Sequence, residues 1–221
     1  MEKMAVVVPS RGRPGNVRRL MDARESTGAS HADFIFCVDD DDPTLEQYLQ
    51  TGAKIDVGPR LRLGPTLSNK IVEVAAEYEV VGFMGDDHLP RTPFWDAILL
   101  SHLHEMGTGI VYGNDLLQGA TIPTSVFMSS DIVKVLGYFC PPGFLHMYLD
   151  NVWKDWGEQA GCLQYLPDVI IEHMHPGNGK ATHDSSYAES GALISQDQMA
   201  YRDYCGNSLE SDVAKIKGLR V

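Results

Sequence analysis

Short apolar runs alternate along the chain with stretches whose apolar residues recur at helical spacing. The apolar runs are rich in Val, Ile and Phe, which is typical of strands buried on both faces. They predict strands at 4–9, 34–38, 54–57, 80–84, 109–112 and 124–128, and a strand pair within 163–171. The stretches between them predict helices at 14–24, 43–49, 64–78, 92–102, 130–136 and 150–161.

This order of elements predicts an α/β fold, a Rossmann-like mixed sheet with helices on both faces and its parallel strands first. After Pro176 the pattern changes to a polar, glycine-rich stretch followed by two modest helical patterns. We therefore expect a main domain at 1–176, with halves at 1–88 and 89–176, and a flexible helical segment at 177–221.

Composition narrows the function classes. The chain of 221 residues has 18 Lys and Arg against 30 Asp and Glu, a net charge of −12, which disfavours a general grip on nucleic acid. Two arginine clusters, one within 11–19 and one at 60–62, indicate either a solvated surface or a local basic cleft. The four cysteines form no CxxC pair, so neither disulfides nor a cysteine zinc site are expected. No run resembles a signal peptide or a membrane span, so we expect a cytoplasmic chain.

Acidic and histidine side chains follow several predicted strands, where an open α/β sheet binds its ligands. They are Asp39–Asp42, Asp86, Asp87, His88, His173 and His175. Carboxylates and imidazoles together suit a divalent cation such as Mn²⁺. Asp-Asp pairs are usually surface turns and single histidines are usually structural, but a buried run delivers Asp86 and Asp87 directly to the edge of the sheet.

The order of the motifs resembles the GT-A glycosyltransferases, in particular the inverting family 2. The first half reads VVVPSRGRP, FIFCVDDDDPT, GPTLSNKIVEVAAE and VVGFMGDDHLP, and the second half reads SSDIVKVLGYF, YLDN and GCLQYLPDVIIEH. The similarity extends from residue 4 to about residue 180. Two positions depart from the family pattern: Gly85 replaces the first aspartate of the metal motif, and Leu149 replaces the first acid of a catalytic pair.

The resemblance implies a nucleotide-diphosphate sugar as donor. Pro9, Ser10 and Arg11 would cradle the nucleotide, and Asp39 would bind the base, with uracil and hence UDP preferred. The remaining predicted donor contacts are Asn69, Lys70, Asp86 and Lys180. For Lys70, an exposed side chain without a role is the alternative. For Asp40–Asp42 we prefer helix capping and solubility.

The resemblance also implies a metal site. Asp86, Asp87 or both would hold Mn²⁺ or Mg²⁺ against the diphosphate, and His173 or His175 would complete the coordination. Alternation along a strand predicts both histidines on the same face, so both stay candidates. His88 is either a neighbour of the ligands or an ordinary turn histidine.

Asp150 is the predicted general base of an inverting transfer, because it lies where the family places its catalytic acid. It is also the predicted N-cap of the helix at 151–160, and the positive helix end is expected to lower its pKa. Trp153 and Trp156 offer either a stacking face for an acceptor or core packing. The stretch 176–184 is either a lid that brings Lys180 and His183 to the diphosphate or a plain linker.

The sequence therefore predicts a metal-dependent glycosyltransferase whose acceptor is a glycan, a protein side chain or a modified nucleobase. Two alternatives remain: a sugar-phosphate nucleotidylyltransferase, and a non-catalytic module that binds a nucleotide sugar. The former needs a long glycine-rich signature after the first strand, for which residues 10–15 are a poor substitute. The oligomeric state is left open.

Overall fold

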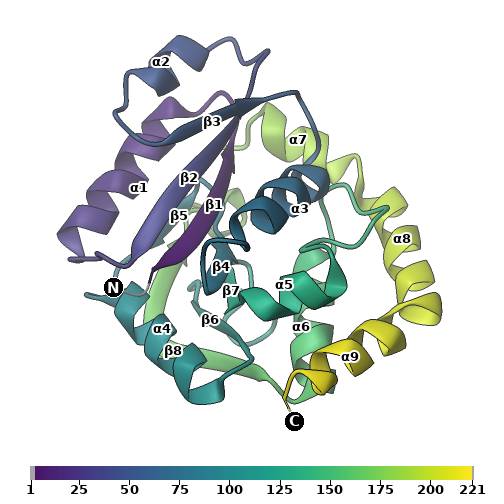
Figure 1. Cartoon of the computed structure of the whole chain (residues 1–221). Coiled ribbons are helices and arrows are strands. Elements are labelled where there is room, and N and C mark those ends of the chain that lie inside the picture. The colour runs from purple at the N-terminus through teal and green to yellow at the C-terminus, as the bar shows by residue number, and fades with distance from the viewer. Residues whose placement is uncertain (1–2, 221) are drawn as a thin grey trace.

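The structure is a computed structural model that describes residues 3–220, with the backbone alone for residues 185 and 186. Within that range, eight strands form one sheet in the order β3-β2-β1-β4-β7-β6-β8-β5 (Figure 1). The strands are β1 Met4–Ser10, β2 Ala32–Asp39, β3 Ile55–Gly58, β4 Val80–Phe83, β5 His88–Pro90, β6 Ile110–Asn114, β7 Val126–Ser129 and β8 Leu163–His173.

The sheet is mixed in the predicted way. Strands β1, β2, β3 and β4 are parallel to their neighbours in that group. Strand β7 is antiparallel to both β4 and β6, β8 is parallel to β6, and β5 is antiparallel to β8. The predicted α/β class with a mixed sheet is confirmed.

Helices cover both faces of the sheet (Figure 1). Their bounds are α1 Pro14–Ser26, α2 Leu45–Leu49, α3 Leu63–Val74, α4 Trp95–Met106, α5 Ser130–Leu136, α6 Leu149–Ala160, η1 Pro176–Asn178, α7 Ser185–Gly191, α8 Ile194–Asn207 and α9 Leu209–Gly218. Helices α1 and α4 pack on one face, and α3, α5 and α6 pack on the other. The apolar runs are continuous because alternate side chains of each strand enter one of these two cores.

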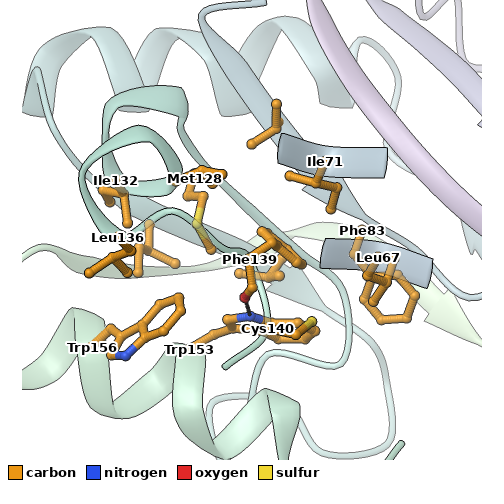
Figure 2. Close-up of a cluster of buried hydrophobic side chains, with 14 of the residues drawn as sticks. Leu67, Ile71, Phe83, Met128, Ile132, Leu136, Phe139, Cys140, Trp153 and Trp156 are labelled. Carbon is orange, nitrogen blue, oxygen red and sulfur yellow. Dashed lines mark hydrogen bonds between the residues drawn. The ribbon is translucent and has the colours of Figure 1, made fainter. Parts of the chain in front are cut away.

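The core on the α3, α5 and α6 face contains two of the tryptophans (Figure 2). Trp153 is buried and its indole N–H donates to the carbonyl of Phe139 at 2.9 Å. Trp156 is buried as well and donates to the Tyr204 hydroxyl at 2.6 Å. Both side chains therefore stabilise the core, and neither presents a ring face to an acceptor.

The last two helices extend the same core. Leu209, Val213 and Ile216 of α9 are buried in it, and Tyr204 of α8 joins them. Asp212 of α9 accepts hydrogen bonds from the hydroxyls of both Tyr138 and Tyr204. Three α-helices follow residue 176 in the described chain, where the sequence pattern predicted two.

Three local expectations were wrong. The segment 163–171 is a single long strand, because the chain bulges around Pro167 between the register pairs Gly113–Leu166 and Asn114–Ile170. Helix α2 begins at Leu45, two residues after the predicted Pro43. The three-residue strand β5 was not predicted, since its apolar content is too short to show a period. Every helix of residues 3–220 is too short or too polar to cross a bilayer.

Candidate functional site

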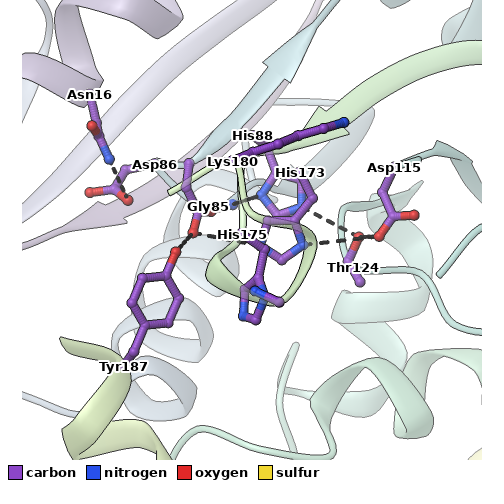
Figure 3. A network of polar contacts seen from close by, with 12 residues as sticks. Asn16, Gly85, Asp86, His88, Asp115, Thr124, His173, His175, Lys180 and Tyr187 are labelled. Carbon is purple, nitrogen blue, oxygen red and sulfur yellow. Dashed lines mark hydrogen bonds and ion pairs between the residues drawn. The ribbon is translucent and has the colours of Figure 1, made fainter. Parts of the chain in front are cut away.

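Polar side chains gather where β1 and β4 end and where β8 reaches its last residue (Figure 3). Ser10 ends β1, Asp86 and Asp87 lie in the turn after β4, and His173 ends β8. Strand β5 pairs with β8, and His88 lies opposite His173 in that pairing. The short strand β5 therefore brings the turn after β4 next to the end of β8, and Asp87 lies beside His173.

Asp86 is buried among donors from the start of the chain. One oxygen accepts from the Ser10 hydroxyl at 2.6 Å, and the other faces Arg13 at 3.1 Å and the Asn16 amide at 3.3 Å. Burial, together with the charge of Asp87, raises the pKa of Asp86 to about 6, although Arg13 opposes the rise. Asp86 therefore accepts hydrogen bonds from one residue each of β1, the loop after it and α1.

Asp87 lies among imidazoles instead. Its two oxygens lie 3.3 Å from Nδ1 of His88 and 3.5 Å from Nε2 of His173. Burial disfavours its ionised form, but the two histidines hold the pKa of Asp87 well below its usual range. Asp87, His88 and His173 each offer one ligand atom within 4.8 Å of the others, which makes them a candidate metal group.

The three histidines differ in what their rings contact. The rings of His88 and His173 stack at 4.2 Å, and His175 meets His173 edge-on at 4.9 Å. His175 lies beyond the end of β8 and its Nδ1 accepts from the backbone N–H of Gly177, so strand alternation does not place it. His173 is thus the histidine that the structure brings to Asp87. Burial lowers the pKa of His173 and His175.

Helix α7 closes over this group from the C-terminal segment (Figure 3). The Tyr187 hydroxyl donates to Asp87 at 2.6 Å, and its ring lies 4.7 Å from the Arg13 guanidinium. Arg13 also pairs with Asp184 at 2.7 Å, and Glu189 pairs with Arg60 at 2.9 Å and with Arg62 at 3.0 Å. Members of both arginine clusters therefore face the C-terminal segment at this edge.

The predicted nucleotide contacts lie on β1 and β2. Pro9 is half-buried in β1, in register with Cys37 of β2. Arg11 pairs with Asp39 at 2.8 Å and with Asp41 at 2.5 Å. Burial raises the pKa of Asp39, against the influence of Arg11.

The other predicted donor contacts lie in helix α3 and after β8. Asn69 is exposed on α3. Lys70 pairs with Asp56 at 3.0 Å and with Glu73 at 2.7 Å, so it is not an exposed lysine without a partner. Lys180 pairs with Glu172 at 2.5 Å, beside the end of β8. Both lysines therefore form ion pairs with protein carboxylates, whereas their predicted role is to bind the phosphates of the donor.

Asp150 lies in the first turn of α6 and not at its N-cap, because Tyr148 caps the helix with φ 66°. Its carboxylate accepts from the backbone N–H of Asn151 at 3.0 Å. Burial raises the pKa of Asp150, which is opposite to the expected direction, and His173 is near enough to act against that rise. The raised pKa makes this carboxylate a stronger base than one at an exposed helix end.

Solved structures share this architecture. S. aureus TarS 1-349 in complex with UDP is 15% identical with a TM-score of 0.57, over 76% of this chain and 59% of that one. Glucosyl-3-phosphoglycerate synthase from Mycobacterium tuberculosis, in complex with Mn²⁺, UDP and phosphoglyceric acid, is 14% identical with a TM-score of 0.65, over 93% and 79%. The mannosyltransferase PcManGT from Pyrobaculum calidifontis, in complex with GDP-Man and Mn²⁺, is 12% identical with a TM-score of 0.64, over 98% and 73%.

The chain has the GT-A fold. No family model matches the sequence, and no curated protein is similar to it in sequence. The GT-A likeness therefore rests on the arrangement of the elements, and the chain spans about three fifths of the TarS fragment.

Several residues of this candidate site were missed by the sequence reasoning. Asn16, Asp115, Thr124 and Tyr187 all contact the predicted acids or histidines, directly or through one residue. Asp115 directly follows β6, so looking beyond the end of that strand, as was done for others, would have found it. Tyr187 gave no comparable signal, because its position depends on how the C-terminal segment folds back.

Proposed function

We propose that this chain is a metal-dependent glycosyltransferase that moves a sugar from a UDP-sugar to an acceptor with inversion of the anomeric centre. The observation that carries the proposal is the ion pair between buried Asp87 and half-buried His173 at the strand-end edge of a GT-A sheet. Similar structures contain UDP or GDP-Man, and two of those named above also contain Mn²⁺. The acceptor is drawn from glycans, protein side chains or modified nucleobases.

The residues at the edge fit a divalent cation. One carboxylate and one imidazole of the three-residue group suit Mn²⁺, and Mg²⁺ would rely more on the carboxylate. Asp86 is bonded by Ser10, Arg13 and Asn16, so we assign the ligand role to Asp87 and His173. A cation held there supplies Lewis acidity that stabilises the leaving diphosphate.

The donor would lie along the ends of β1 and β2. Pro9 and Ser10 line the end of β1, Arg11 and Asp39 form the pair next to it, and Asp39 is the proposed partner of the uracil base. We keep Asn69, Lys70 and Lys180 as proposed contacts of the donor, which for the two lysines requires release from Asp56, Glu73 and Glu172.

Asp150 is the proposed general base. It lies on the opposite half of the sheet from the nucleotide contacts, near His173, in a partly buried position that raises its pKa. Its carboxylate would accept the proton of the acceptor hydroxyl as that oxygen attacks the anomeric carbon. Such assistance contributes about 10²–10⁴-fold to the rate.

Turnover of a panel of UDP- and GDP-sugars, with Mn²⁺ and with a chelator, tests the reaction class. Slow hydrolysis of one donor that requires the cation is the expected result, because transferases without their acceptor pass the sugar to water. Pyrophosphate-dependent synthesis of the donor would identify a nucleotidylyltransferase. Tight binding of a donor that stays intact with every acceptor class would identify a binding module.

Asp150→Asn tests the base. We expect turnover to fall by about 10²–10⁴-fold with donor affinity nearly unchanged. Asp155→Asn, the same change one turn further along α6, is the control and should retain activity. Proton NMR of the product checks the stereochemistry: an α-linked product from an α-linked donor would show retention and remove this role from Asp150.

A further inference from the structure

The two ring nitrogens of His173 face two different carboxylates. Nε2 lies 3.5 Å from Asp87, and Nδ1 lies 4.0 Å from an oxygen of Asp115. Nδ1 is buried and has no hydrogen-bond partner among residues 3–220. An orphaned buried ring nitrogen next to a carboxylate indicates that the arrangement is completed in another state of the site.

Asp115 is held rigidly from both sides. One carboxylate oxygen accepts from the backbone N–H groups of Leu117, Gln118 and Gly119 at 2.7–2.9 Å. The other oxygen accepts from the Thr124 hydroxyl at 2.8 Å. The carbonyl of Asp115 accepts from the backbone N–H of His173 at 2.9 Å, so the end of β8 is tied to the same residue. At 2% exposure, Asp115 has a fixed carboxylate directed at the rear of the His173 ring.

His88 is engaged differently. Its Nδ1 faces the backbone N–H of Gly85 at 3.1 Å and Asp87 at 3.3 Å, and its Nε2 faces Thr124 at 3.4 Å. Both nitrogens of His88 are therefore already directed at protein groups, whichever of them is protonated. Of the two imidazoles in the metal group, His173 has the nitrogen that can turn to a cation while its other nitrogen keeps a proton.

We propose that Asp115 is a positioning residue that holds the His173 ring proton on Nδ1 and so keeps the Nε2 lone pair for the cation shared with Asp87. This inference rests on the proposed metal site. A neutral imidazole carries one proton, and a ligating nitrogen must be bare. Without metal, Asp87 at 3.5 Å and Asp115 at 4.0 Å compete for that proton, and a cation bound to Asp87 and Nε2 would leave the proton to the fixed carboxylate of Asp115. Carboxylates behind ligating histidines typically contribute about 10–100-fold to metal affinity.

The alternative role for Asp115 is to anchor its own loop, and Asp115→Asn separates the two. The asparagine oxygen keeps the three backbone contacts of the loop, and the amide NH₂ replaces the oxygen that faces His173 and Thr124. The amide then donates to Nδ1 of His173, which moves the ring proton to Nε2 and blocks that nitrogen as a ligand. Asn114→Ala is the control, because it removes the side-chain contact with the backbone N–H of Leu116 in the same loop and leaves the Asp115 carboxylate with all of its contacts.

Calorimetric titration of the full chain with Mn²⁺, together with ¹⁵N NMR of the histidine rings without metal at pH 8, tests the proposal. The His173 signals are assigned by their loss in His173→Gln. In Asp115→Asn we expect Mn²⁺ affinity to fall about 10–100-fold and the Nε2–H form of His173 to increase. In Asn114→Ala we expect an unchanged tautomer ratio and Mn²⁺ affinity within about threefold of wild type.

Two results overturn the proposal: an Asp115→Asn variant with wild-type affinity or an unchanged His173 tautomer ratio, and an Asn114→Ala variant that loses as much affinity as Asp115→Asn. The tautomer measurement needs no metal, so it stays informative if the metal assignment fails. A wild-type chain that binds no Mn²⁺, but whose His173 proton shifts in Asp115→Asn, contradicts the metal site and supports the orienting role of Asp115.

Discussion

Asp86 and Asp87, the adjacent aspartates after β4, have different partners, although the sequence alone did not distinguish their roles. Asp86 turns toward β1 and α1, where Ser10 and Arg13 bind it, and Asp87 turns toward the histidines of β5 and β8. Side chains of neighbouring residues in an extended turn point in different directions, so only one of the pair meets His173. The tertiary contacts decide between roles that the motif alone left open.

Paired substitutions test this division of roles. Asp87→Asn removes a carboxylate from the metal group, and we expect Mn²⁺ binding to be lost or weakened at least about tenfold, a change of 1.4 kcal/mol. Asp86→Asn leaves Arg13 without a buried anionic partner, so we expect a loss of about 1–3 kcal/mol of folding stability with Mn²⁺ affinity nearly kept. Calorimetry and chemical denaturation measure the two effects. The reverse pattern would transfer the ligand role to Asp86.

Asp42, the last residue of the acidic run Asp39–Asp42, has a structural role. Its two oxygens accept from the backbone N–H of Thr44 and from the backbone N–H of Gly12, both at 2.7 Å. Burial opposes ionisation, but these bonds outweigh it and lower the pKa of Asp42. Because the folded pKa is below the ordinary value, the carboxylate stabilises the fold above about pH 4, and the stabilisation is lost as the pH falls through the folded pKa.

Asp42→Asn should therefore lower the free energy of unfolding at pH 7 by about 1–2 kcal/mol, since the amide keeps the Thr44 bonds and cannot accept from Gly12. Denaturation in urea at pH 7 and near pH 3 measures the difference from wild type. We expect that difference to shrink at the acidic pH. A difference that stays constant with pH would show that the charge of Asp42 does not matter.

Among the elements, α7 contacts both the metal group and the arginines beside it. Its Tyr187 hydroxyl donates to the Asp87 oxygen that faces His173, so this bond competes with a cation for that oxygen. Its Glu189, and Asp184 directly before the helix, pair with arginines that could otherwise bind a diphosphate. Under the proposed function, donor binding requires α7 to change these contacts; the stretch 176–184, predicted as either a lid or a linker, directly precedes this helix.

Tyr187→Phe tests that competition. Removing the hydroxyl frees Asp87 of a bond worth about 1 kcal/mol, so we expect Mn²⁺ affinity without nucleotide to rise about fivefold. Tyr201→Phe is a matched control, because its hydroxyl also donates to a carboxylate, that of Asp155, at 2.6 Å, in the contact between α8 and α6. Equal affinity in wild type and Tyr187→Phe would contradict the competition.

The sequence predicted those elements whose patterns are long enough to show a period. The runs at 4–9 and 34–38 became β1 and β2 because both faces of these strands are buried. The predictions failed where the structure depends on distant partners. Strand β5 exists only through its pairing with β8, and β8 continues past Pro167 because its bulge fits β6. Tyr187 reaches the site through the fold of the C-terminal segment, which no local pattern specifies.

On the scale of the whole molecule, the last two helices and the sheet share one hydrophobic core. Ile216 of α9 is fully buried in the cluster that contains Trp156. We expect Ile216→Ala to cost about 2–5 kcal/mol, the range for a large buried aliphatic residue, and to lower the midpoint of a single unfolding transition. Far-UV circular dichroism and tryptophan fluorescence should give coincident curves. Two separate transitions would show that 177–221 folds as an independent unit.

The central claim is that this GT-A chain binds a nucleoside diphosphate through a cation held by Asp87 and His173. Calorimetric titration of the wild-type chain with UDP, in Mn²⁺ and in excess chelator, tests it most directly, with GDP as the comparison and Asp87→Asn as the variant. We predict that UDP binds in Mn²⁺, that it binds more tightly than GDP, and that its affinity falls by at least about tenfold, or 1.4 kcal/mol, when the cation or the Asp87 carboxylate is removed. Equal UDP affinity in Mn²⁺ and in chelator, or in wild type and Asp87→Asn, would contradict the claim.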